Sequence, residues 1–237
     1  LFAMTWVHSG TGVKMPVRRI AEAVRDHNRG KPAEQRTVFA VDGVHGFGIE
    51  DVAIPDLGAD FLIAGTHKWI TGPRGTGLVW GRKDAWPLIQ PTIPSFDPMW
   101  RPPPFDSMPL VALHTPGGFH SFEHRWALDE AFKFHSAIGR GRVAERIHQL
   151  NSLAKAGMAR LAKVRIHTPM SPDLSAGIIA FEVAGLAPGQ VVERLHRQGI
   201  VASVTPGFYT PALARVAPSL LTVEEDVERT VRAIAAL

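Results

Sequence analysis

The chain has no cysteine in its 237 residues. Disulfide bonds, thiolate metal sites and mechanisms that need a cysteine nucleophile are therefore excluded. Tyrosine is almost as scarce, since Tyr209 is the only one; it could act as an acid–base group or simply pack. No stretch approaches the ~18 to 20 continuous apolar residues of a membrane helix, so no membrane partner is expected.

Dense basic runs are missing too. The net charge is a modest +4 and arginine is spread along the chain, so we expect no nucleic-acid partner. Residues 1–7 show no basic region followed by a long apolar core, which favours a cytoplasmic protein. They look like a strand already begun, so we expect the later part of a longer protein, whose earlier part would carry any export signal.

Short apolar runs bounded by glycine and proline dominate the first third of the chain and predict buried strands. These runs are residues 1–7, 37–41, 58–64 and 75–81, with residues 49–53 as a short link. A helix is expected after Pro16, because proline suits a first helical turn. Strands alternating with helices indicate an α/β domain with a mainly parallel sheet, over residues 1–122.

The rest of the chain divides at two changes of pattern. Residues 123–162 predict a connecting helical segment, and residues 163–237 predict a small C-terminal α+β domain. In the latter, Thr222 with Glu225 three positions on predicts a capping box that opens the last helix. Its expected elements are strands at 164–166, 178–183, 200–204 and 213–217 and helices at 188–198 and 223–237. The proline-rich residues 89–109 predict a loop, either a lid or a subunit contact.

Lys68 and Asp42 suggest a specific chemistry. Lys68 follows six mostly small or apolar residues and a histidine, and Asp42 ends the strand 26 positions earlier. Ligands gather at the carboxyl ends of such strands, where both residues fall. Pyridoxal-phosphate (PLP) enzymes need an amine to hold the aldehyde as a Schiff base and a carboxylate to keep the pyridine nitrogen protonated. We therefore expect PLP as cofactor, with Lys68 and Asp42 as catalytic residues.

Three runs, residues 41–46 (VDGVHG), 66–69 (THKW) and 72–77 (GPRGTG), resemble the class V aminotransferase family of fold-type I PLP enzymes. The resemblance covers the whole chain, in the branch of isopenicillin N epimerase-like and cysteine desulfurase-like proteins. It implies the later part of a PLP-dependent transferase (aspartate aminotransferase-like) fold. It also implies an amino-acid substrate and a homodimer with sites shared across the interface.

The resemblance implies further cofactor contacts around Lys68. His45 matches a catalytic position near the cofactor's ring oxygen, while His67 matches a phosphate contact and Thr66 offers a hydroxyl beside it. Ser9 stands where desulfurases have asparagine, and Thr11 is an alternative for that contact.

Two more positions follow from the resemblance. Arg215 matches the arginine that forks onto the substrate α-carboxylate. Residues 117–124 replace a glycine–threonine segment that reaches the neighbouring subunit's cofactor phosphate, so His120 or Ser121 would substitute there. His114, His120, His124 and Glu123 could instead hold a metal, but they lack a regular ligand spacing, so no metal is expected.

The missing cysteine narrows the expected reaction. A desulfurase takes sulfur on a loop cysteine just before the carboxylate arginine, and residues 203–210 offer none. Epimerisation and β-elimination, including C–S cleavage, are therefore preferred to transamination. The glycine-rich loop that wraps the phosphate in this family is not recognisable, which keeps open a truncated, inactive homologue acting as a structural subunit. A nucleotide-binding oxidoreductase would need a glycine fingerprint before a helix, and residues 72–77 precede a strand.

Overall fold

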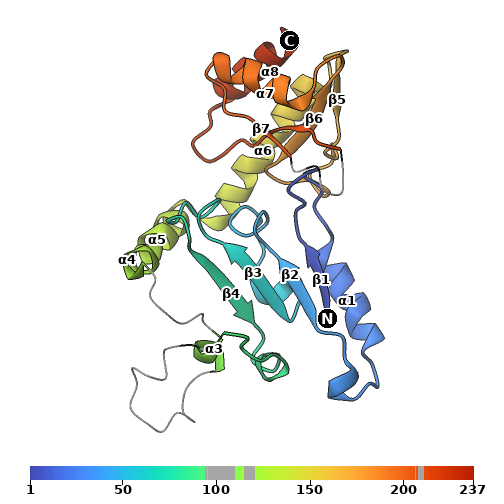
Figure 1. The fold of residues 1–237 in the computed structure, drawn as a ribbon, viewed down its shortest axis with the longest axis vertical. Coiled ribbons are helices and arrows are strands. Elements are labelled where there is room, and N and C mark those ends of the chain that lie inside the picture. Colours follow the sequence, from blue (N-terminus) through green and yellow to red (C-terminus); the bar gives the residue numbers. More distant parts are fainter. Residues whose placement is uncertain (94, 96–109, 115–120, 206, 208–210) are drawn as a thin grey trace.

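A computed structural model describes the chain except residues 94, 96–109, 115–120, 206 and 208–210. Two sheets lie in separate layers, one in each half of the molecule, and a long helix runs past both (Figure 1). The expected α/β class, with a small C-terminal α+β part, is confirmed.

The larger sheet has the strand order β1-β2-β3-β4. Its strands are β1 (Phe2–Thr5), β2 (Phe39–Asp42), β3 (Phe61–Gly65) and β4 (Gly77–Gly81). The first three are parallel, and β4, which follows β3 through residues 66–76 with no crossover helix between them, is antiparallel to it. The crossover from β1 to β2 is made by α1 (Val17–His27), followed by a 3-10 turn, Ala33–Gln35.

Helix α1 covers one face of this sheet. Its buried residues Val17 and Ala21 pack in one core with Val41 and Leu62, which are fully buried in the central strands. Continuous apolar runs in β2 and β3 are what such central positions require, because they are covered along most of their length. Burial of this kind is the main stabilising term for the sheet.

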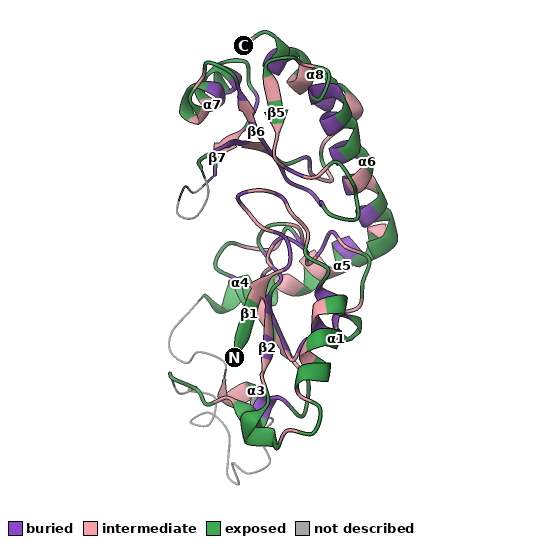
Figure 2. Cartoon of the chain, turned by 90° about the vertical axis from the view of Figure 1, so that its right-hand side faces the viewer, coloured by how far each residue is buried: buried purple, intermediate pink, exposed green. Residues whose placement is uncertain are grey.

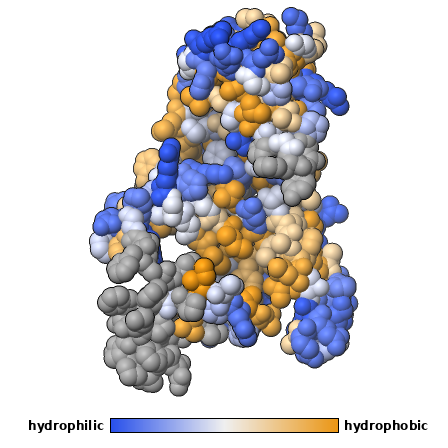
Figure 3. Space-filling model, viewed as in Figure 1, coloured by the Kyte–Doolittle hydropathy of each residue, from blue (hydrophilic) through white to orange (hydrophobic). Residues whose placement is uncertain are grey.

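The other face of the sheet is only partly covered. Ile63 and Val79 face each other across β3 and β4 and are 44% and 52% exposed. Figure 3 shows hydrophobic side chains gathered over this part of the molecule. Residues 1–7 were expected to be buried, but β1 is an edge strand, and Phe2 is 40% exposed while Trp6 and Val7 are buried.

A series of helices connects the two sheets. They are α3 (Leu110–Leu113), α4 (Phe122–Trp126), α5 (Leu128–Ile138) and α6 (Arg140–Met158). Gly139, with φ of 96°, separates α5 from α6, because this backbone conformation ends a helix and costs glycine little. Helix α6 buries Val143 and Ile147 against the larger sheet's core and Leu150 against the smaller one (Figure 2).

The smaller sheet is antiparallel, with strand order β5-β6-β8-β7. Its strands are β5 (Val164–Ile166), β6 (Ile179–Val183), β7 (Ser203–Val204) and β8 (Ala214–Val216). Helices α7 (Pro188–Arg197) and α8 (Glu224–Ala235) pack with α6 on this sheet around the buried Phe181 and Leu195.

Two local predictions were wrong. In residues 200–204 only Ser203–Val204 pairs. Helix α8 begins after Val223, whose N–H donates to Asp226 Oδ2 at 3.2 Å, so Thr222 and Glu225 do not form the expected capping box. The Thr222 hydroxyl instead accepts a hydrogen bond from the N–H of Ser219. Within the described residues, no helix combines the length and apolarity needed to cross a membrane.

Candidate active site

The carboxyl ends of β2 and β3 bring the predicted residues together. Asp42 ends β2 and His45 follows in the next turn, while Lys68 lies three residues beyond the end of β3. Because β2 and β3 are parallel neighbours, their carboxyl ends open onto the same edge of the sheet. Asp42 and Lys68 are separated by 26 positions in the sequence, but the fold therefore places them at the same edge of the sheet.

Lys68 and His45 form the central contact of this edge. Lys68 Nζ lies 3.1 Å from His45 Nε2. The His45 side chain is only 7% exposed, and its ring meets Trp69 edge-on at 6.4 Å between centroids. Burial, together with the charges of Lys68 and Arg215, lowers the pKa of His45 to about 4, so this imidazole is neutral at pH 7.

The Lys68 amine has a lowered pKa as well. Burial is the main cause and the Arg215 guanidinium adds to it, while Asp42 opposes the shift. The amine therefore loses its proton more readily than a surface lysine does. Since an ammonium group can only donate, the neutral His45 ring accepts at Nε2 and carries its own proton on Nδ1.

Arg215 reaches the same edge from the other half of the molecule. It lies in β8, where its Nε donates to Ser203 Oγ at 3.0 Å and its Nη1 donates to the Ser9 carbonyl oxygen at 2.9 Å. These bonds fix the plane of the guanidinium group, which is half-buried, and burial lowers its pKa. Ser9 thus takes part through its backbone, although the sequence suggested its side chain.

A cavity of about 350 Å³ lies between the two halves and contains three of the predicted residues. Its walls are His45, Lys68, Trp69, Ile178, Val201, Ala202, Ser203, Arg215, Ala217 and Ser219. Two cationic side chains and a neutral imidazole therefore face one another above a mostly apolar wall. Such a cavity suits a small anionic molecule with an apolar part.

Asp42 lies beside this cavity. Its side chain is exposed, and Oδ1 accepts a hydrogen bond from the N–H of Val44 at 3.0 Å. Its charge acts on Lys68, where it favours the ammonium form. The position one turn before His45 keeps the carboxylate at the same sheet edge as the amine.

Thr66 and His67 are not among the residues that line the cavity. The buried Thr66 hydroxyl lies 2.6 Å from Thr76 Oγ1, which itself donates to the Pro73 carbonyl. Thr66 must therefore donate to Thr76 in this arrangement. His67 is exposed, and its ring lies against Gly65. Their contacts with a cofactor phosphate stay predictions.

The histidine-rich segment after residue 114 is only partly described. His120 and Tyr209 lie outside the described residues, while the exposed Ser121 hydroxyl donates to Glu123 Oε2 at 3.0 Å. Among the described residues, no group of three or more histidine, aspartate or glutamate side chains could hold a metal ion. The cofactor contacts of His120 and Ser121 stay predictions.

The comparison with protein families rests on almost the whole chain. Residues 1–233 match the family described as aminotransferase class V. The chain belongs to the class V aminotransferase family. The resemblance carried by the runs around Asp42, Lys68 and residues 72–77 is thereby confirmed, and the enzymes of this family use PLP.

Similar class V proteins have several activities. An isopenicillin N epimerase of Streptomyces clavuligerus is 28% identical across 100% of this chain and 60% of its own length. A probable hercynylcysteine sulfoxide lyase of Mycobacterium tuberculosis is 26% identical across 97% of this chain and 53% of its own. The solved apo cysteine desulfurase of Thermococcus onnurineus has a TM-score of 0.82 at 21% identity, over 99% of this chain and 58% of that one. The chain therefore spans little more than half the length of these relatives.

The residues at the cavity fit PLP in three respects. A partly exposed amine with a lowered pKa faces open space, as covalent capture of an aldehyde requires. His45 Nδ1 and Trp69 Nε1 are buried without a hydrogen-bond partner among the described residues, and such atoms are costly unless a bound group satisfies them. Asp42 supplies a carboxylate within electrostatic reach.

Trp69, Ser203 and the Ser9 carbonyl were missed as site components by the sequence. Trp69 was given no role beyond its place in the run THKW, yet its indole lines the cavity and lies so close to Gly177 that a Cβ there would come within 2.5 Å of Cη2. Ser203 carries no comparable signal, because a serine at the end of a predicted strand is an ordinary residue there. Backbone contacts such as that of Ser9 leave none at all.

The low pKa of His45 predicts an acid-sensitive fold. The unfolded residue titrates near 6.5 and the folded one at about 4, so between these values the unfolded chain binds a proton that the folded chain excludes. The free energy of unfolding therefore falls as the pH drops from 6.5 to 4, by about 3 kcal/mol from this residue. Urea unfolding measured between pH 6.5 and 4 should show a smaller fall in the free energy of unfolding for His45→Gln than for the unaltered protein. Equal pH dependence of both proteins would contradict the prediction.

Proposed function

We propose that the protein containing this chain is a PLP-dependent enzyme acting at the Cα of an amino acid through Lys68, with epimerase-like or C–S lyase-like chemistry. The observation that carries the proposal is the 3.1 Å contact between Lys68 Nζ and a buried, neutral His45, in a cavity shared with Arg215. A plain structural lysine would need neither an uncharged partner nor a lowered pKa.

Bound PLP supplies an aldehyde that captures amines and a ring that draws electrons from the substrate Cα. Lys68 would hold the cofactor and then, once displaced by substrate, take the proton from Cα; its lowered pKa makes the amine lose its proton more readily than an ordinary lysine does. His45 Nε2 lies where it can receive a proton from the amine or return one. Asp42 would hold a proton at the pyridine nitrogen.

Arg215 would orient the substrate. A guanidinium group matches the two oxygens of an α-carboxylate in one plane, and the bonds to Ser203 and Ser9 already fix that plane. The apolar residues Ile178, Val201 and Ala217 would exclude water from the reacting carbon. Ser9, Thr66 and His67 are proposed cofactor contacts from the family pattern.

Two relatives support the preference within the family, because one is named an epimerase and another a sulfoxide lyase. Other relatives are named probable cysteine desulfurases. Persulfide chemistry of that kind is disfavoured because this chain has no cysteine to take the sulfur. A homodimer, in which His120 or Ser121 reaches the neighbouring subunit's cofactor, is part of the same proposal.

The reaction can be tested by following the Cα proton. We expect an L-amino acid incubated with the PLP-loaded protein in deuterium oxide to exchange its Cα hydrogen, detected by mass spectrometry. Formation of the D-enantiomer without pyruvate or ammonia would indicate an epimerase, whereas pyruvate and ammonia would indicate a lyase. An amino group transferred stoichiometrically to a keto acid, with neither of these signatures, would contradict both preferred reactions.

A further inference from the structure

Helix α6 buries a lysine completely, in the part of the helix that packs on the smaller sheet. Lys155 has no exposed surface, although lysine is among the residues that are least often buried. It forms no ion pair with a carboxylate in the part of the chain that the structure describes, and burial, together with the charge of Lys14, lowers its pKa to about 8. At pH 7 the group is therefore mostly an ammonium ion, and a buried charge without a counter-ion is costly unless other polar groups satisfy it.

Three oxygen atoms bind the Lys155 amine. Nζ donates to the carbonyl oxygens of Pro169 and Met170, at 2.8 and 3.0 Å, and to Ser175 Oγ at 2.6 Å. The Ser175 hydroxyl donates its own proton to a backbone carbonyl four residues earlier, at 2.7 Å, so it can only accept from the lysine. All three partners are therefore acceptors, and only the ammonium form has a proton for each. Lys155 thus ties residues 168–175, which we call the tethered segment, to α6.

The tethered segment in turn holds residues 8–14, the loop that follows β1, which we call the β1 loop. The Leu174 carbonyl accepts the N–H of Lys14 at 2.8 Å. The Thr168 hydroxyl donates to the Thr11 carbonyl at 2.6 Å. Because these bonds lie at two separate points of the β1 loop, they fix its orientation as well as its distance from the tethered segment.

The β1 loop carries the contact that reaches the candidate active site. Its Ser9 carbonyl accepts the hydrogen bond from Arg215 Nη1 at 2.9 Å. Gly12, with φ of 70°, lies so close to the tethered segment that a Cβ there would come within 2.8 Å of Thr168 Oγ1. A loop in such close contact keeps its place only while the neighbouring segment keeps its own. The position of the Ser9 oxygen, and with it the plane of Arg215, therefore depends on Lys155.

A second path leads from the tethered segment to the wall of the cavity. Ser175, which Lys155 holds, lies two residues before Gly177 and three before Ile178. The Trp69 indole packs on Gly177 and leaves no room for a Cβ, and Ile178 lines the cavity with Trp69. Lys155 thus supports both the arginine and the apolar wall, although it is not itself one of the residues that line the cavity.

We propose that Lys155 is a positioning residue for the substrate carboxylate: it holds the Ser9 carbonyl, and through it the Arg215 guanidinium group, in the plane that a carboxylate requires. This inference rests on the proposed function, in which Arg215 binds the substrate. A well-packed apolar side chain is often no less stable than a buried charge, so stability alone does not explain a lysine here. The role concerns binding more than the chemical step, because Lys68 and His45 follow the ends of β3 and β2 and not the β1 loop.

Lys155→Met tests the role in the PLP-loaded protein, since methionine has a similar length and adaptable shape but donates no hydrogen bond. We expect KM for an amino-acid substrate to rise by about tenfold with kcat nearly unchanged, because one of the two bonds that orient Arg215 is weakened. In Arg215→Lys, which has already lost that orientation, Lys155→Met should change KM by about twofold or less. Equal effects in the two backgrounds would overturn the proposal, since Lys155 would then act independently of Arg215.

Hydrogen–deuterium exchange of the full chain tests the structural path without a substrate, so a failure of this inference can be told from a failure of the proposed function. We expect the Lys14 amide, which donates to Leu174, to exchange about tenfold faster in Lys155→Met, with the amides of α1 unchanged. Ser175→Ala removes one of the three acceptors and should show a smaller change of the same kind, in exchange and in KM. It serves in place of the methionine variant if that variant does not fold. Unchanged exchange of the β1 loop would overturn the proposal, whether or not an amino acid reacts.

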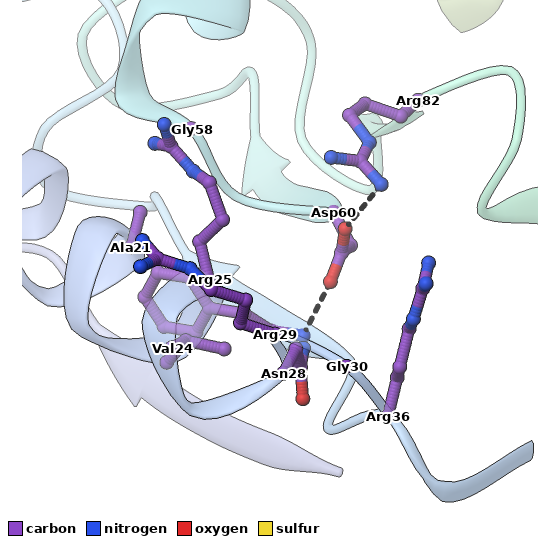
Figure 4. A pocket seen from close by; sticks show the side chains of 11 residues that line it. Ala21, Val24, Arg25, Asn28, Arg29, Gly30, Arg36, Gly58, Asp60 and Arg82 are labelled. Atoms are coloured by element: carbon purple, nitrogen blue, oxygen red, sulfur yellow. Dashed lines mark hydrogen bonds and ion pairs between the residues drawn. The ribbon is translucent and has the colours of Figure 1, made fainter. Parts of the chain in front are cut away.

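Asp60→Ala is the matched control, because Asp60 is also a charged side chain that anchors the backbone. Its carboxylate accepts the N–H of Phe39 at 2.8 Å and pairs with Arg82 at 3.1 Å, beside a cavity of about 400 Å³ (Figure 4). Asp60 precedes β3, so it lies at the end of the larger sheet opposite the candidate active site. Its loss should leave KM and the exchange of the β1 loop unchanged. If Asp60→Ala changed both as much as Lys155→Met does, the effect would be one of general stability, and the positioning role would be refuted.

Discussion

Lys68→Ala is expected to abolish covalent capture of PLP and to lower turnover by about a thousandfold or more. The amine is both the attachment point and the base at Cα, and a positioned base alone contributes 10²- to 10⁴-fold. In the unaltered protein, borohydride reduction followed by peptide mass spectrometry should find the cofactor's mass on Lys68. In the variant that mass should disappear, together with the visible absorption of the bound cofactor.

Two further variants make this experiment specific. Lys68→Arg keeps a positive charge beside His45 but is not a useful nucleophile, so it should be as inactive as the alanine variant. Lys163→Ala removes an exposed lysine just before β5 and should behave like the unaltered protein. If the cofactor were reduced onto another lysine, or if Lys68→Ala kept its turnover, the assignment of Lys68 would be wrong. Binding without turnover by any form would support the structural-subunit alternative.

The larger sheet could be predicted because its central strands leave a strong pattern. β2 and β3 are covered on most of their length, so they appear as unbroken apolar runs ending in Asp42 and Gly65. The edge strand was harder: an apolar run such as residues 1–7 looks the same whether a neighbour covers it or not. The exposure of Phe2 depends on what lies beside β1, which local sequence does not encode.

The predictions of helix starts and short strands were wrong for a different reason. Thr222 and Asp226 both offer side-chain oxygens near the beginning of α8, and the sequence cannot rank their bonds to competing backbone donors. Residues 200–204 are rich in β-formers, yet only Ser203–Val204 finds a partner, in β8. Strand propensity measures fit to a neighbouring strand, and that neighbour is set by tertiary structure.

Site residues could be predicted where the proposed chemistry requires a particular side chain. They could not be predicted where the contact is made by a backbone atom. Lys68 and Arg215, which the structure places at one cavity, were singled out because an amine and a guanidinium group have few substitutes. The Ser9 carbonyl that holds Arg215 could come from any residue. Outside the site, the burial of Lys155 in α6 was not predicted either: it is fully buried and donates to Ser175 Oγ at 2.6 Å, although a lysine in a helix is ordinarily expected at the surface.

Arg215→Lys is expected to raise the KM for an amino-acid substrate by about a hundredfold while lowering kcat much less. Lysine keeps the charge but cannot form two parallel bonds to a carboxylate while also bonding to Ser203 and Ser9. Losing about two charge-assisted hydrogen bonds costs on the order of 3 kcal/mol, which is about two orders of magnitude in affinity. Steady-state kinetics with any substrate that shows Cα exchange would measure the effects on KM and on kcat separately.

The matched control is Arg165→Lys, in β5 of the same sheet. Arg165 is also a strand arginine with a polar partner, Glu182 at 3.6 Å, but it is exposed and lies outside the cavity. Its replacement should leave KM unchanged, because an exposed ion pair contributes little. If both variants raised KM equally, the effect would come from the sheet as a whole. If Arg215→Lys lowered kcat with no change in KM, Arg215 would act on the reaction itself, and another group would have to hold the carboxylate.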